Sequence, residues 1–157
     1  MSEKKSATVR ALDVEARTAT VYPPPLASAV KGRSKRALGD HFGLNQFGFN
    51  HVTLEPGASS SIRHYHMKED EFVYVIEGEI TLFDNDGEHR LTPGMCAGFK
   101  AGVANGHRLV NNSNQPAAYL EVGSRYSEED ANYPDADLVG AKRNGKFTFT
   151  RKDGTSY

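Results

Sequence analysis

Several features that would narrow the function of this chain are scarce in its sequence. Among 157 residues there is one cysteine, Cys96, and no tryptophan. A disulfide within the chain and a cysteine-rich zinc cluster are therefore both excluded. No apolar run approaches the roughly 18 residues that a membrane-spanning helix needs, and no apolar segment of the secretory kind follows the charged start MSEKK. We expect a protein of the reducing cytoplasm.

The chain also lacks an excess of charge of one sign. Charged residues make up 25% of the sequence and the formal net charge is -1, so no overall field favours nucleic acid or a membrane surface as a partner. A basic cluster at residues 31–36 is the local exception, and such clusters are usually solvated surface. Phosphate-loop, G-x-G-x-x-G and G-x-S-x-G motifs are absent from the sequence. We expect neither a nucleic-acid nor a membrane partner.

Short strand-like segments are abundant instead. They combine β-branched and aromatic residues with bounding Gly, Pro, Asn or Asp, and they include residues 46–54, 71–78, 79–84 and 117–123. About eight to ten such strands in a chain of this length predict one all-β domain, a sandwich or barrel. Gly78 falls between two of these segments and predicts a sharp bend. The ends differ, because residues 23–40 read as an irregular arm and Ser127 as the start of a short helix. The alternating tail after Gly145 predicts a late strand.

The stretch RHYHMKEDEFVYVIEG, residues 63–78, contains the first candidate site. Residues two apart in a strand point the same way, so His64 and His66 share a face and can converge on one ion at about 2.0–2.1 Å. The intervening MKED turn is long enough to reverse the chain and bring Glu71 beside the pair. Strand alternation places Glu71 on the apolar inner face with Val73 and Val75, where a bare carboxylate is costly unless it is paired or bound to a cation.

A third histidine follows about forty residues later. The pair Asn105–Gly106 predicts a turn, after which His107, Leu109 and Asn111 share one face of a strand. Three imidazoles and one carboxylate form a donor set that suits Fe, Mn, Co, Ni or Zn rather than Ca or Mg.

Alternatives to these ligands are also present in the sequence. Glu69 and Asp70 compete with Glu71 for the acidic position, but their place in the turn is more typical of solvated charges. His51 is a further candidate to face inward from its strand. We expect Cys96 to be a small core residue, since no histidine is tied to it by local spacing.

These residues resemble the two motifs of the cupin superfamily. The first motif is represented by Gly57, His64, His66, Glu71 and Gly78, and the second by Gly94, Lys100, Gly102, His107 and Asn111. Two departures concern the second motif: Lys100 occupies the usual proline position, and the spacer between Gly102 and His107 is longer than usual. Further segments across residues 36–157 are similar to a group of small bacterial single-domain cupins.

The resemblance implies a single-domain cupin β-barrel, that is, a double-stranded β-helix or jelly roll. We expect an N-terminal arm at residues 1–40, the barrel at 41–125, and a C-terminal extension at 126–157 formed by a short helix or strand. The resemblance also implies a ligand set of His64, His66, Glu71 and His107 for one divalent metal ion per chain, a small-molecule ligand in the barrel, and a homodimer.

Cupins perform many reactions, so the fold does not identify one. Four protein ligands leave neighbouring positions of a six-coordinate ion free, which suits a chelating oxygenated metabolite. We favour a metal-dependent enzyme of the oxygenase, isomerase, decarboxylase or lyase type. The alternative is a non-catalytic cupin that binds a small molecule or is stabilised by its metal.

Overall fold

The computed structural model of the protein describes residues 6–157 and is dominated by short strands, as the sequence predicts. The strands are β1 (Arg33–Ala37), β2 (Phe47–Leu54), β3 (Tyr65–His66), β4 (Glu71–Glu77), β5 (Ile80–Asp84), β6 (Gly87–Leu91), β7 (Cys96–Phe99), β8 (Arg108–Val110), β9 (Ala117–Ser124), β10 (Glu129–Tyr133), β11 (Leu138–Arg143) and β12 (Lys146–Thr150). The helical segments are short: 3-10 turns at Ala11–Asp13 and Pro24–Val30, and α1 (Leu38–His41). Within the described residues, no helix has the length and apolar character needed to cross a bilayer.

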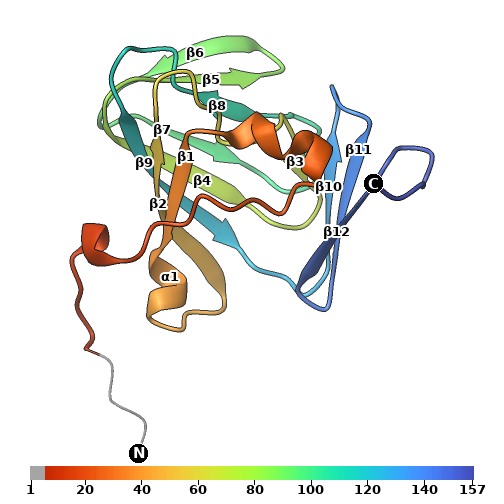
Figure 1. Cartoon of the computed structure of the whole chain (residues 1–157), viewed down its shortest axis with the longest axis horizontal. Helices are drawn as coiled ribbons and strands as arrows, with labels where there is room; N and C mark the ends of the chain where they lie inside the picture. Colours follow the sequence, from red (N-terminus) through yellow and green to blue (C-terminus); the bar gives the residue numbers. More distant parts are fainter. Residues whose placement is uncertain (1–5) are drawn as a thin grey trace, which may run out of the picture.

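The strands form three antiparallel sheets. A five-stranded sheet has the order β1-β2-β9-β4-β7, a three-stranded sheet the order β6-β5-β8, and a four-stranded sheet the order β12-β11-β10-β3. Figure 1 shows the four-stranded sheet, mostly blue, beside the barrel strands, with the orange helical turn lying in front of them. Several neighbouring strands, such as β2 and β9, β4 and β9, or β3 and β10, are distant in the chain, as a jelly-roll barrel requires.

The core lies between these sheets and follows the period-two alternation of the strands. In β4 the inward Val73 and Val75 are fully buried, whereas Phe72, Tyr74 and Ile76 on the other face are exposed. The predicted inner face of this strand is thereby confirmed. Each fully buried aliphatic side chain contributes about 1.5–3 kcal/mol to folding.

Gly78 makes the sharp bend that the sequence predicts between β4 and β5. Its φ is 74°, in the left-handed region, and a Cβ on it would lie 2.7 Å from the carbonyl oxygen of Pro116. Only glycine fits both the conformation and the space. The bend passes the chain from the five-stranded to the three-stranded sheet.

Two terminal segments differ from the sequence prediction. Residues 33–37, expected to be part of an irregular arm, form β1 and pair with β2 over their whole length. The helix expected from Ser127 is replaced by strand β10, whose buried Glu129, Ala131 and Tyr133 alternate with half-buried residues. Both strands carry charged residues at inward positions, so their hydrophobic periodicity is weak and their sequence does not read as a strand. The predicted late strand in the tail is confirmed as β12.

Two local expectations are also wrong. The turn before His107 is centred on Ala101 and Gly102, where the amide of Val103 donates to the carbonyl of Lys100 at 3.3 Å, rather than on Asn105–Gly106. Cys96 is exposed rather than buried, because it pairs with Tyr74 on the outer face of the five-stranded sheet.

Candidate metal centre

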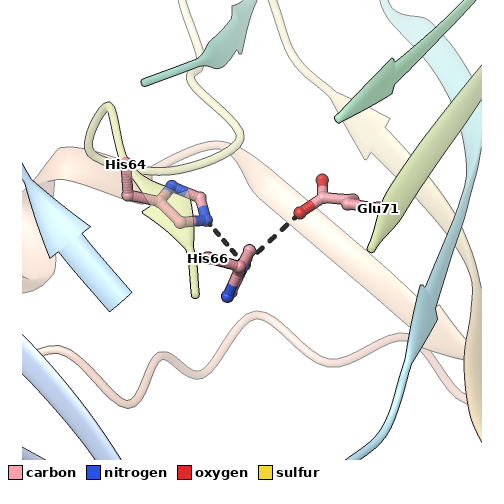
Figure 2. A group of neighbouring side chains, drawn as sticks. All are labelled: His64, His66 and Glu71. Atoms are coloured by element: carbon pink, nitrogen blue, oxygen red, sulfur yellow. Dashed lines mark hydrogen bonds and ion pairs between the residues drawn. The ribbon is translucent and has the colours of Figure 1, made fainter. Parts of the chain in front are cut away.

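Three of the four predicted ligands converge at one point (Figure 2). The Nε2 atoms of His64 and His66 are 3.1 Å apart, and His66 Nε2 lies 3.5 Å from Glu71 Oε2. One ligand atom from each of these three residues lies within 4.8 Å of the other two. A single cation between them could therefore contact all three.

The route by which Glu71 reaches the histidines differs from the expected hairpin. Strand β3 pairs with β10 in the four-stranded sheet, whereas β4 pairs with β7 and β9 in the five-stranded sheet. Glu71 thus approaches the two histidines from a different sheet. The cluster depends on how two sheets meet, and not on a local turn.

His107 joins the group by two kinds of contact. Its backbone forms an antiparallel bridge with His64, with N–O distances of 2.8 and 3.1 Å. Its Nε2 lies 3.6 Å from Glu71 Oε2, and its ring stacks on Phe99 at a centroid distance of 3.5 Å. The fourth predicted ligand therefore borders the cluster through the carboxylate of Glu71.

The protonation of His64 suits a neutral ligand. Burial lowers the pKa of His64 to about 3, although the charge of Glu71 opposes this. Its Nδ1 lies 2.9 Å from the carbonyl oxygen of Ile62, which can only accept a hydrogen bond. The proton of the neutral ring is therefore on Nδ1, and the lone pair of Nε2 faces the cluster.

Glu71 and His66 form the charged part of the site. Burial alone would raise the pKa of Glu71, but the adjacent imidazoles of His107 and His66, whose Nε2 atoms lie 3.6 and 3.5 Å from Oε2, lower this pKa well below its usual value. Burial would likewise lower the pKa of His66, yet the carboxylates of Glu71 and Glu129 raise it overall. The carboxylate thus remains anionic, as a metal ligand must be.

Unsatisfied atoms in the same place indicate that the side chains fit a metal ion. Both ring nitrogens of His107 and Nδ1 of His66 are buried and have no hydrogen-bond partner among the described residues. Buried polar atoms are nearly always paired. A cation among mixed nitrogen and oxygen donors would satisfy the His107 nitrogen that faces Glu71.

Glu129 is a component that the sequence analysis missed. Its side chain is 0% exposed, its Oε1 lies 3.7 Å from His66 Nδ1, and it accepts hydrogen bonds from the amides of Met67 and Lys68 at 2.6 and 2.9 Å. This position behind His66 is typical of a carboxylate that orients a ligating imidazole. No clear local signal marked this residue, because a charged side chain at an inward position weakens the hydrophobic alternation of residues 129–133.

The competing acidic residues have other partners. Glu69, expected to be a solvated turn charge, is instead mostly buried and contacts Lys142 Nζ and the amide of Tyr126. Glu69 and Glu129 also form a second possible metal group with His66, but Lys142 already supplies a cation there. Asp70 is exposed and accepts a hydrogen bond from the amide of Ala101 at 2.8 Å. In β2, the side chain of His51 points to the face opposite to that of its neighbours Asn50 and Val52. It therefore points away from the cluster.

The cluster opens into a cavity of about 800 Å³. Residues with functional groups in its lining include His64, His66, Glu71, Arg33, Lys35 and Glu121. Arg33 donates from Nη1 to the carbonyl of Ser60 at 2.7 Å, but its buried Nε has no partner, and no carboxylate among residues 6–157 forms an ion pair with it. The lining of one cavity therefore contains both the cluster and the guanidinium of Arg33, a cation without an anionic partner.

Comparisons with known proteins agree with this architecture. The sequence profile of the Cupin domain matches residues 50–123. A crystal structure from Silicibacter pomeroyi, described as a sugar phosphate isomerase from a cupin superfamily, is 49% identical with a TM-score of 0.91, and the match covers 96% of each chain. A structure from Acidithiobacillus ferrooxidans, described as a candidate sugar phosphate isomerase, is 26% identical with a TM-score of 0.73, over 87% of this chain and 95% of that one.

A curated relative matches over a shorter region. The tetracenomycin polyketide synthase protein TcmJ of Streptomyces glaucescens is 34% identical over 89 residues, which represent 55% of this chain. The chain spans 58% of the length of that relative. The match with the Silicibacter pomeroyi protein along nearly its whole length agrees with the jelly-roll strand arrangement and the matched domain profile. Together they show that this chain belongs to the cupin superfamily.

Proposed function

We propose that this cupin is a metal-dependent isomerase of a small phosphorylated sugar. The main support is one cavity that joins a histidine–carboxylate cluster to a guanidinium without an anionic partner. The 49% identical protein described as a sugar phosphate isomerase supports the reaction class.

The proposed ligands of one divalent ion of Zn, Fe, Mn, Ni or Co are His64, His66, Glu71 and His107. Neutral imidazole nitrogens and one carboxylate oxygen match the preference of these ions. When bound, the ion would polarise an oxygen of the substrate and make the neighbouring carbon more acidic. The close Nε2–Nε2 contact between His64 and His66 supports this assignment, because two lone-pair-bearing nitrogens gain from a cation between them.

Arg33 is the proposed recognition group for the phosphate. A planar guanidinium presents several donors that match the oxygens of a phosphate. Ser60 and Ser61 line the same cavity, and their hydroxyls add further hydrogen-bonding capacity. Burial of an unpaired cation is costly, so a substrate anion would relieve that cost. The volume of the cavity, about 800 Å³, is within the usual range for small-molecule sites.

An isomerase assay tests the proposal directly. Protein purified without added metal is analysed for its elements and then incubated with monophosphates of aldotriose, aldotetrose, aldopentose and aldohexose, with product detection by NMR. We expect a stoichiometric transition metal and conversion of at least one aldose phosphate to its ketose. Absence of conversion across the panel by metal-replete protein would contradict the proposed function.

The Arg33→Gln variant tests the phosphate contact. Loss of a charged hydrogen bond to phosphate is expected to raise KM by about 10- to 100-fold, from about 1.5–3 kcal/mol, with bound metal unchanged. Arg36→Gln is a matched control, because Arg36 neighbours Arg33 on β1 but points to the opposite face. Equal KM values for the two variants would place the phosphate elsewhere.

A second candidate is an activity on polyketide-like aromatic compounds. The lining of the cavity includes Tyr22, Tyr133, Phe147 and Phe149, and the 34% identical relative is named as a polyketide synthase protein. Stabilisation by a polycyclic phenol, without conversion of any sugar phosphate, would favour this candidate. Ligand binding with no turnover of either substrate class would favour the non-catalytic alternative.

A further inference from the structure

The geometry points to Glu121 as the carboxylate that moves the proton between two substrate carbons. We infer that Glu121 is a catalytic residue, with Lys35 and Asn50 as its positioning residues. This inference rests on the proposed isomerase function and names a group that the metal ligands do not provide.

Strand register places Glu121 close to the candidate metal centre. On the adjacent strands β4 and β9, Glu71 is opposite Gly123 and Val73 is opposite Glu121. Glu71 and Glu121 are therefore diagonal neighbours on one sheet face, with a backbone separation of about 7–8 Å. Gly123 has no side chain to fill the space opposite Glu71. The two carboxylates thus border one open volume, and both line the cavity.

The hydrogen bonds of Glu121 leave one of its oxygens available. Lys35 Nζ and Asn50 Nδ2 both donate to Oε1, at 2.6 and 2.9 Å. Within the part of the chain that the structure describes, no donor contacts Oε2. The side chain is 18% exposed, so the free oxygen is shielded from bulk water yet open to the cavity. The positive charge of Lys35 compensates the carboxylate in this half-buried position.

The other carboxylates near the cavity are already engaged. Both oxygens of Asp40 face cations, with Oδ1 at 2.6 Å from Arg125 and Oδ2 at 3.9 Å from Arg17. Glu71 belongs to the candidate ligand set. Glu121 is therefore the carboxylate of the cavity lining that combines a fixed position with a free oxygen.

A single carboxylate is sufficient for the isomerisation. In an aldose, Glu121 Oε2 would take the proton from the second carbon, while the hydroxyl proton on that carbon moves to the aldehyde oxygen. The same carboxylic acid would then return its proton to the first carbon, giving the ketose. One carbon–hydrogen bond breaks and one forms, one hydroxyl proton changes oxygen, and no external oxidant or reductant is needed. General acid–base catalysis of this kind contributes about 10²–10⁴-fold to the rate.

The test compares Glu121→Gln with the wild type, using the aldopentose and aldohexose monophosphates. We expect kcat to fall by about 10²–10⁴-fold, with KM and bound metal nearly unchanged. Washout of tritium from the second carbon of the substrate should fall equally. Calorimetric binding of pentitol and hexitol phosphates, which cannot isomerise, should be preserved. This binding measurement reports on the cavity independently of turnover.

Asp40→Asn is the matched control, since it also converts a cavity carboxylate to an amide beside a cation. It should retain kcat within a few-fold. An active wild type whose Glu121→Gln variant keeps its kcat would overturn this inference but not the proposed function. A wild type without isomerase activity would overturn both. If Glu121→Gln loses metal or melts below the assay temperature, Glu121→Asp decides: normal metal content with wild-type kcat would contradict a base role, and a large loss of kcat would support it.

Discussion

At the scale of single residues, the pKa values of His64 and His66 shift in opposite directions although the two imidazoles are only a few ångströms apart. His64 is neutral because burial dominates its pKa, whereas His66 gains affinity for a proton from Glu71 and Glu129. A bound cation would replace that proton. This competition explains why a site with one anionic and several neutral donors suits a divalent metal.

Glu129 gives the sharpest prediction at this scale. Glu129→Gln should weaken metal binding by about 10- to 100-fold, because the amide can no longer provide a charged partner for His66 Nδ1. Competitive titration with a coloured chelator measures the affinity. Glu128→Gln is the control, since Glu128 is the adjacent residue but its side chain is 61% exposed. Identical affinities for the two variants would exclude a positioning role for Glu129.

At the scale of elements, the bend between β4 and β5 connects the five-stranded sheet to the three-stranded sheet. Gly78 combines a left-handed φ with backbone atoms of Pro116 and Ala117 within 2.8 Å of the position of a Cβ. The strand that ends at this bend carries Val73 and Val75, which are fully buried in the core.

The Gly78→Ala variant should lower the free energy of unfolding by about 2–6 kcal/mol, from backbone strain plus steric overlap. Gly94→Ala is the matched control, because Gly94 has a φ of 92° but no atom near its Cβ position. The control should lose only about 1–3 kcal/mol, from strain. Urea denaturation of both variants isolates the overlap. Equal losses would show that the chain around Pro116 adjusts without cost.

At the scale of the whole molecule, residues from separate sheets form the candidate centre, so metal binding and folding should be coupled. A ligand that binds only the folded state at a free concentration of 100 Kd stabilises it by about 2.7 kcal/mol. Chelation should therefore lower Tm, and added Mn²⁺ or Zn²⁺ should restore it. In the His66→Ala variant, neither treatment should shift Tm. A metal-dependent shift in that variant would place the ion elsewhere.

We propose that the outer face of β4 is the interface of the expected homodimer. Phe72, Tyr74 and Ile76 are 44%, 40% and 37% exposed along one strand, and contiguous exposed apolar surface often marks an interface. Tyr74→Glu is predicted to convert a dimer to a monomer in light scattering coupled to gel filtration. Leu12→Glu, at an exposed position outside this sheet, should leave the mass unchanged. A wild-type monomer would contradict the expectation.

Strand content, the bend at Gly78 and the inner face of β4 could all be predicted from the sequence, because they depend on local alternation and on a glycine conformation. The donors His64, His66 and Glu71 could also be named from the sequence, but their convergence depends on how two sheets meet and not on the hairpin that the sequence predicted. Strand β1 and the buried Glu129 could not be predicted in this way. Their strands place charged groups inward, and such groups are stable there only beside partners that are remote in the sequence.

The sequence by itself determined an all-β chain with a candidate donor set, because side-chain direction in a strand follows from parity alone. The tertiary structure decided which partners those donors meet: Glu71 from one sheet, His64 and His66 beside another, Glu129 behind His66, and Glu121 diagonal to Glu71. Strand order and sheet closure are non-local, so pairs such as Lys35 and Glu121 become neighbours only when the barrel forms.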